Sequence, residues 1–219
     1  MWSTGLHSIV WVGLRGRNLI GLWAVPILLA VVALAFDAAD RRFASSVLAS
    51  GALDEPAHLA TGALGLLALA CFIDAPCRFY VAGLIASVAI DLDHVPEYLG
   101  LIGQQPGRPP THSLITVVAV VVAAAVTRRH RAVLVGAGTG LLSHFARDIA
   151  EGPPGVRMLV PLSDTSWTAS FGWFLATILT LTGIRLVFAT LGIPRTRIRL
   201  FQAPAPGERS SPISVDSRT

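Results

Sequence analysis

The chain has 219 residues, of which 53% are hydrophobic and only 14% are charged, and its mean hydropathy is +0.64. Soluble domains carry about a quarter charged residues, so this composition excludes an ordinary soluble domain and indicates a membrane protein. All 17 basic residues are arginine and the formal net charge is +4, which without a basic patch gives no reason to expect nucleic acid as a partner.

Six apolar segments follow one another along the chain. A membrane-crossing helix needs about 20 apolar residues, so the length allows five or six crossings. We expect the segments at residues 19–36, 57–73, 79–90, 113–127, 132–150 and 168–191. The predicted fold is all-α, a polytopic membrane protein with a bundle of five to six transmembrane helices. It forms a single domain over residues 1–194, followed by a disordered cytoplasmic tail, rich in Arg, Pro and Ser, over residues 195–219.

The first apolar segment follows Arg15 and Arg17 and ends near residues 33–35, which read Ala-Leu-Ala and resemble a signal-peptide cleavage site. The hydrophobic region of a signal peptide usually has about 7–15 residues, and this segment is longer. We therefore expect an uncleaved first helix. Both interpretations place the following polar connection, residues 37–56, on the outer side of the membrane, and this connection could include a short interfacial helix.

The later connections are short or rich in glycine and proline. Residues 74–78 are predicted to form a tight turn, and residues 100–110 and 151–167 to form loops. Cys71 and Cys77 flank the tight turn on the predicted cytoplasmic side. We expect free thiols there, because disulfides persist in oxidising compartments.

The distribution of arginine predicts how the protein is oriented in a plasma or inner membrane. With both termini in the cytoplasm, nine arginines fall inside and five fall outside. The inner set is Arg15, Arg17, Arg78, Arg128, Arg129, Arg131, Arg195, Arg197 and Arg199, and the outer set is Arg41, Arg42, Arg108, Arg147 and Arg157. This orientation brings the start of the second segment, the end of the third, the start of the fourth and the end of the fifth to the outer face.

Polar side chains that can bind metals lie at these four ends. The stretch from Ile90 to Leu114 concentrates several of them between two apolar segments. The predicted metal ligands are His58, Asp91, Asp93, His94, His112, His144 and Asp148. Since the topology was assigned from arginines alone, the convergence of these residues supports a metal site.

The spacing within two of these groups suits a shared ion. His144 and Asp148 lie four residues apart, so both can face one ion from a single helix. If the third segment continues as a helix, Asp91 and His94 share a face. If the chain is extended there, Asp91 and Asp93 share a face instead.

Imidazole and carboxylate ligands suit zinc, and also manganese or iron. Four histidines and three aspartates exceed what one tetrahedral ion needs, so we expect either two divalent ions or one ion with outer carboxylates that orient the histidines. A metal-activated water would supply a nucleophile. Arg108 could hold a phosphate or carboxylate, and Glu97 or an unligated aspartate such as Asp93 could act as general base.

The order of these motifs resembles that of the YdjM/YbcI-like family of membrane-bound, metal-dependent hydrolases. The resemblance covers roughly residues 57–163 and rests on four motifs: His58-x-x-x-Gly62, Asp91-x-Asp93-His94, Arg108-x-x-Thr111-His112-Ser113-Leu114, and His144-x-x-x-Asp148 followed by residues 155–161. The resemblance implies a multi-helix inner-membrane protein that acts as a hydrolase, by analogy with zinc-dependent phospholipases.

Some of these residues also have simple structural interpretations. Thr111 is expected to cap the fourth segment, with Ser113 assisting it. The acidic group after the third segment could be a helix stop with solvated charges, and His144 with Asp148 could be a plain hydrogen-bonded pair. Ionisable groups within membrane segments are costly, however, and mark functional sites by default. The metal site is therefore the favoured interpretation.

Three functions are compatible with such a site. The first is a hydrolase that cleaves a phosphoester or ester bond of a lipid or lipid-linked substrate at the outer face of the membrane. The second is a metal or proton transporter, which the nearly complete lack of polar residues in the second and fourth segments disfavours. The third is a non-catalytic scaffold whose metal ties helix ends together.

Overall fold

The computed structural model describes residues 19–99, 101, 108–153 and 155–191. Its helices are α2 (Leu19–Phe43), α3 (Val47–Leu69), α4 (Cys77–Ala89), α5 (Val95–Tyr98), α6 (Leu114–Val126), α7 (Arg131–Asp148) and α8 (Phe171–Leu191), with the 3-10 helices η1 (Ile90–His94) and η2 (Arg128–His130). Within the described residues, β pairing is limited to one isolated bridge between Val156 and Trp167. The all-α prediction is confirmed.

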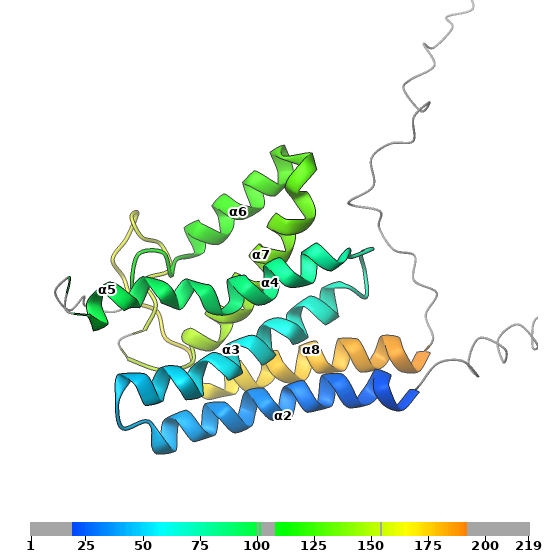
Figure 1. Ribbon diagram of the computed structural model, residues 1–219, viewed down its shortest axis with the longest axis horizontal. Coiled ribbons are helices and arrows are strands. Elements are labelled where there is room, and N and C mark those ends of the chain that lie inside the picture. Colours follow the sequence, from blue (N-terminus) through cyan, green and yellow to red (C-terminus); the bar gives the residue numbers. More distant parts are fainter. Residues whose placement is uncertain (1–18, 100, 102–107, 154, 192–219) are drawn as a thin grey trace, which may run out of the picture.

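Helix α7 is the central element of the fold. It packs along α4 and also contacts α3, α6 and α8, while α2, α3 and α8 pack against one another (Figure 1). The short helix α5 and the loop that follows α7 lie at one end of the molecule, and the turn between α6 and α7 lies away from it (Figure 1). Helix α7 therefore links two distinct ends.

Glycines allow α4 and α7 to approach closely. A Cβ atom on Gly136 would overlap the carbonyl oxygen of Phe79, and a Cβ atom on Gly140 would overlap that of Gly83. Small residues at such positions let two helix backbones come together in a membrane protein. The contact continues one turn further, where the ring of His144 reaches the carbonyl oxygen of Ser87.

Two of the described helices are long and apolar enough to cross a membrane. These spans are Leu22–Phe43 in α2 and Phe171–Thr190 in α8, and α6 is a shorter apolar helix. Both spans expose large apolar side chains, including Leu28 and Leu179 at 61% each. A bundle of five or six crossings remains a prediction.

Helix α3 begins ten residues earlier than the second segment was predicted to begin. The polar connection expected over residues 37–56 is mostly helical, because α2 continues to Phe43 and α3 starts at Val47. Ser46 caps α3 through its side-chain oxygen, which accepts a hydrogen bond from a backbone N–H of the first turn. The predicted start of the second segment was wrong because polar residues in the first turns of α3, such as Asp54, were assigned to the connection, where only a short interfacial helix was considered.

The other boundaries are closer to expectation. The third segment does continue as helix beyond Ile90, first as η1 and then as α5. The expected capping of the fourth segment is confirmed for Ser113 and wrong for Thr111. Ser113 caps α6 by accepting a hydrogen bond from the backbone of Thr116, whereas the hydroxyl of Thr111 donates to Asp93. The predicted tail over residues 195–219 lies outside the described residues.

Candidate metal centre

Four parts of the chain bring polar side chains to the C-terminal end of α7. Helix α3 contributes one histidine, η1 three residues, the segment before α6 one histidine, and α7 itself two residues. These are His58, then Asp91, Asp93 and His94, then His112, and finally His144 and Asp148. The α3, α7 and pre-α6 side chains are buried, and the η1 side chains are partly buried.

Four atoms of this group lie close together: Oδ1 of Asp91, Nε2 of His112, Nε2 of His144 and Oδ2 of Asp148. His112 Nε2 is 3.0 Å from the Asp91 atom, 3.2 Å from the His144 atom and 3.7 Å from the Asp148 atom. His144 Nε2 is 3.1 Å from the Asp148 atom and 3.6 Å from the Asp91 atom. Ligands roughly 2.0–2.1 Å from a tetrahedral ion are about 3.3–3.4 Å apart, so these distances suit one ion.

In both His112 and His144, Nδ1 contacts an acceptor on the side of the ring away from the four clustered atoms. His144 Nδ1 lies 2.9 Å from the carbonyl oxygen of Ser87, which can only accept, so this nitrogen carries a proton and donates. In the neutral ring, Nε2 then presents its lone pair to the cluster. His112 Nδ1 lies 3.1 Å from Oδ2 of Asp93, so its ring is held in a similar way. Metal-binding histidines are typically oriented like this.

The centre of the cluster contains more acceptors than donors. Both buried oxygens of Asp148 and Oδ2 of Asp91 accept no hydrogen bond of normal geometry from the described residues. Buried carboxylates are costly unless a cation compensates them, and Arg108, 3.3 Å from Oδ1 of Asp148, does so for one of these oxygens. A divalent cation would pair with these oxygens and with the two imidazoles, and this donor set suits zinc, manganese or iron.

Asp93 and His94 lie further from the four central atoms. Oδ2 of Asp93 accepts from the Thr111 hydroxyl and faces Nδ1 of His112, on the side of the ring that points away from the cluster. His94 Nε2 is 4.0 Å from Oδ1 of Asp91 and 3.9 Å from Oδ1 of Asp93. His94 still has a ligand atom within 4.8 Å of ligand atoms of Asp91 and His112.

His58 contacts the cluster but is also engaged by an arginine. Its ring stacks on that of His144, with centroids 3.8 Å apart and an interplanar angle of 18°. Its Nε2 lies 2.9 Å from Nη1 of Arg147, and because arginine can only donate, this contact uses the Nε2 lone pair. Asp148 Oδ1 and Asp54 Oδ2 also approach His58 Nε2, at 3.4 Å and 3.3 Å.

A cavity of about 390 Å³ opens beside the cluster. Arg108 stands at its edge, where Nη2 is 3.3 Å from Oδ1 of Asp148 and also forms an ion pair with Glu151. Its wall includes the side chains of Asp54, Glu55, Asp91, His94 and Arg108. The apolar side chains of Leu92 and Val95, 68% and 40% exposed, also line it. The cavity therefore connects a charged interior with an apolar rim.

Without a metal, burial and neighbouring charged groups shift the pKa values of His112, Asp91 and His94. Burial alone would lower the pKa of His112, but hydrogen bonds to Asp91 and Asp93 outweigh it and raise the pKa to about 9. Burial opposes ionisation of Asp91, yet its hydrogen bond to His112 and the charge of His144 lower its pKa. Burial and the charge of His112 lower the pKa of His94. In the metal-free protein, His112 is therefore protonated at neutral pH.

The comparison with known protein families decides the affiliation of the chain. The family model described as YdjM inner membrane protein matches residues 53–205, which is more than half of the sequence. The chain belongs to the YdjM family. The predicted resemblance is thereby confirmed, and so is the expectation of an inner membrane protein. No curated protein and no solved structure matches the chain.

All seven predicted ligands lie within the YdjM-matched region, and the structure brings them to one end of α7. Of the predicted catalytic residues, Asp93 and Arg108 lie beside the cluster. The side chain of Glu97 lies outside the described part of the structure. The sequence did not reveal which of the seven face the centre and which support them.

The sequence did not predict a network of charged residues next to the candidate metal centre. Arg147 is only 1% exposed, and its guanidinium pairs with three carboxylates from different elements. It contacts Asp54 of α3, lies 2.6 Å from Oε1 of Glu151, and lies 3.4 Å from Oδ1 of Asp37 in α2. The four-residue spacing of Asp54 and His58 would have indicated a shared helical face, had α3 been recognised as helical there.

Proposed function

We propose that this YdjM-family protein is an integral-membrane, metal-dependent hydrolase that cleaves a phosphoester or ester bond of a lipid or lipid-linked substrate. The observation that carries the proposal is the set of four clustered atoms beside a cavity whose wall includes Asp91. Structural zinc sites are closed, whereas catalytic sites keep access to the substrate. The adjoining cavity therefore supports catalysis.

We propose one divalent ion, zinc in the first instance, with manganese and iron as alternatives. It would be held by Asp91, His112, His144 and Asp148. A second ion would need the neighbouring group that includes His58, where the guanidinium of Arg147 already supplies a cation. Two cations so close would repel each other strongly in a buried site. The expected ratio is one ion per chain, measured by elemental analysis of the purified protein.

Each surrounding residue then has a role in the proposed reaction. A bound divalent ion supplies Lewis acidity and a water-derived nucleophile near neutral pH. Asp93 orients His112 through Nδ1. Arg108 binds an anionic oxygen of the substrate through its planar guanidinium. Glu55, in the cavity wall, offers a carboxylate for proton transfer. From the sequence, this role of general base was expected of Glu97 or Asp93.

The cavity rim supports a membrane lipid as the source of the substrate. Leu92 and Val95 present apolar surface next to the charged interior. A lipid could place its polar head among the charged groups and its chain along these side chains. No feature of the described residues suggests a nucleic acid as substrate, and the protein partners stay unspecified.

The proposed orientation is multi-pass, with both termini cytoplasmic and the metal centre at the outer face. The arginines of η2 precede α7, while the metal ligands lie at its other end, about 20 Å away for a rise of 1.5 Å per residue. Arginine-rich turns favour the cytoplasmic side. This arrangement supports an outward-facing site.

A non-catalytic scaffold is the second candidate, and one observation favours it. Four protein ligands would fill the coordination of a tetrahedral zinc ion without leaving an open position. In that case metal removal would lower the melting temperature, and no substrate would be turned over. Transport has less support, because Leu66, Phe79 and Val135 pack together in an apolar cluster.

The proposal is tested with the purified full-length protein and a panel of phospholipids and lipid esters. His112→Ala should lose both the bound metal and hydrolysis. His130→Ala, an exposed histidine of η2, is the matched control and should keep both. Equal hydrolysis by metal-free and metal-loaded protein would rule out a metal-dependent hydrolase. Metal binding and thermal stabilisation without turnover of any substrate would favour the scaffold.

A further inference from the structure

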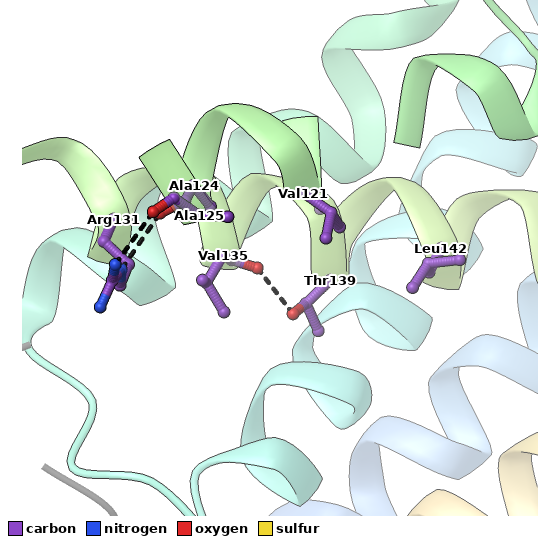
Figure 2. Close-up of a pocket in the computed structure, with 8 residues that line it drawn as sticks. Val121, Ala124, Ala125, Arg131, Val135, Thr139 and Leu142 are labelled. Atoms are coloured by element: carbon purple, nitrogen blue, oxygen red, sulfur yellow. Dashed lines mark hydrogen bonds between the residues drawn. The ribbon is translucent and has the colours of Figure 1, made fainter. Parts of the chain in front are cut away.

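A second cavity, of about 300 Å³, lies between α6 and α7. Figure 2 shows Val121, Ala124 and Ala125 of α6 facing Val135 and Leu142 of α7, with Arg131 at one end. We call this cavity the α6–α7 groove. It is separate from the cavity at the metal centre, since the two share no lining residue.

The walls of the α6–α7 groove are suited to a hydrocarbon chain. Thr139, which lines the groove, donates its hydroxyl hydrogen to the carbonyl oxygen of Val135 at 2.8 Å, so this polar group already has a hydrogen-bond partner within α7 (Figure 2). Val121 and Leu142 remain 53% and 48% exposed. The rise from Val135 to Leu142 is about 10 Å, a large part of the roughly 15 Å of hydrocarbon in one leaflet.

The charged end of the groove is suited to an anion. Nε and Nη2 of Arg131 donate to the carbonyl oxygens of Ala124 and Ala125, both at 3.1 Å, and this holds the guanidinium at the groove end (Figure 2). These bonds use two of its five N–H groups. Arg128 and Arg129 are exposed on the adjoining η2, and residues 114–147 contain no aspartate or glutamate. The local charge is therefore positive.

We propose that the α6–α7 groove and the three arginines bind one anionic phospholipid, with an acyl chain in the groove and the phosphate against the arginines. The apolar walls recognise the chain and the arginines recognise the headgroup charge. In the orientation proposed above, this site faces the cytoplasmic leaflet, whose surface potential is negative. The inference does not depend on metal binding or on hydrolysis.

The test measures lipid binding to the full-length protein in detergent by native mass spectrometry. The probes are phosphatidylglycerol and phosphatidylcholine with identical acyl chains. We expect one phosphatidylglycerol molecule to bind at least tenfold more tightly than phosphatidylcholine. The double variant Arg128→Gln, Arg129→Gln should lower phosphatidylglycerol affinity by about fivefold per arginine, with little change for phosphatidylcholine. Arg42→Gln, in the last turn of α2, is the control for loss of one arginine away from the groove, and should leave the affinity for both lipids unchanged.

A second pair of variants tests the groove itself. Ala125→Phe places a ring in the groove and should abolish binding of both lipids, whereas Val122→Phe places a ring at an exposed residue that does not line the groove and should not. Thermal unfolding checks that each variant is folded. Equal wild-type affinity for the two lipids, or phosphatidylglycerol binding unchanged in both arginine and Ala125 variants, would overturn the proposal. So would a dimer that forms in wild type and is lost in Ala125→Phe, because a second copy would then occupy the groove.

Discussion

The charged residues at the two ends of helix α7 differ in burial. At the C-terminal end, His144, Arg147 and Asp148 are buried among ionisable groups from α2, α3 and η1. At the N-terminal end, the arginines of η2 are exposed beside an apolar groove. Buried charges require compensating partners, whereas exposed charges do not. The C-terminal end therefore indicates a cation site, and the N-terminal end indicates contact with a charged surface.

The largest effect should come from the middle of α7, where the two ends are joined. Gly140→Ala would force a methyl group onto the carbonyl oxygen of Gly83 and should destabilise the protein by about 3 kcal/mol. Gly138→Ala is the matched control, because its nearest neighbour, on Val120, would be 3.6 Å away. This control should be neutral or gain up to about 1 kcal/mol. Thermal unfolding in detergent measures both, and equal melting temperatures would contradict the close α4–α7 contact.

At the C-terminal end, two histidines that stack on each other should differ in importance. His144→Ala removes a proposed ligand and should reduce metal affinity more than hundredfold, the upper end of what loss of a supporting residue costs. His58→Ala should have a smaller effect, because Nε2 of His58 is engaged by Arg147. Competition with a chelator measures both affinities. A larger loss for His58→Ala would place the ion on the α3 side of the cluster.

Asp93→Asn tests the support behind His112. The change keeps the size of the side chain but removes its charge, and loss of such a partner typically lowers metal affinity 10–100-fold. Asp164→Asn, at a side chain that is 90% exposed, is the control and should leave the affinity unchanged. The same chelator competition applies. An unchanged affinity in Asp93→Asn would mean that the His112 ring is held by other contacts.

A change of pH tests the proton on His112 without altering the sequence. Because the pKa of His112 is raised from 6.5 to about 9, its proton stabilises the metal-free fold below pH 6.5, and this stabilisation is lost as the pH rises through 9. Metal must displace the same proton, so metal affinity should rise about tenfold per pH unit in this window and level off above it. The arginines do not titrate there, so lipid preference at the α6–α7 groove should stay constant. A flat metal affinity between pH 6.5 and 9 would contradict protonation of His112.

Much of the fold could be predicted, because long apolar runs bounded by Gly, Pro and Arg identify helices without any tertiary information. Helices α6, α7 and α8 begin and end within three residues of the predicted segments. The start of α3 could not be identified in this way, since Asp54 and Glu55 line the cavity beside the candidate metal centre and break the apolar pattern. Polar residues beside the candidate site therefore concealed the first turns of α3.

The candidate site was predictable as a set of residues but not as an arrangement. Spacing along one helix indicated that His144 and Asp148 act together. It could not show that Ser87 offers a backbone carbonyl to His144, or that Arg147 pairs with Asp37, because these contacts join residues distant in sequence. Such partners are determined by how the helices pack, which the pattern of one chain does not contain.

The position of α7 late in the chain has a consequence for biogenesis. Asp91 and His112 are synthesised before His144 and Asp148, so the four clustered atoms cannot meet until α7 has inserted beside α4. A nascent or misassembled chain lacks half of the proposed ligands. The ion content of a preparation would therefore measure the fraction of molecules that have completed assembly.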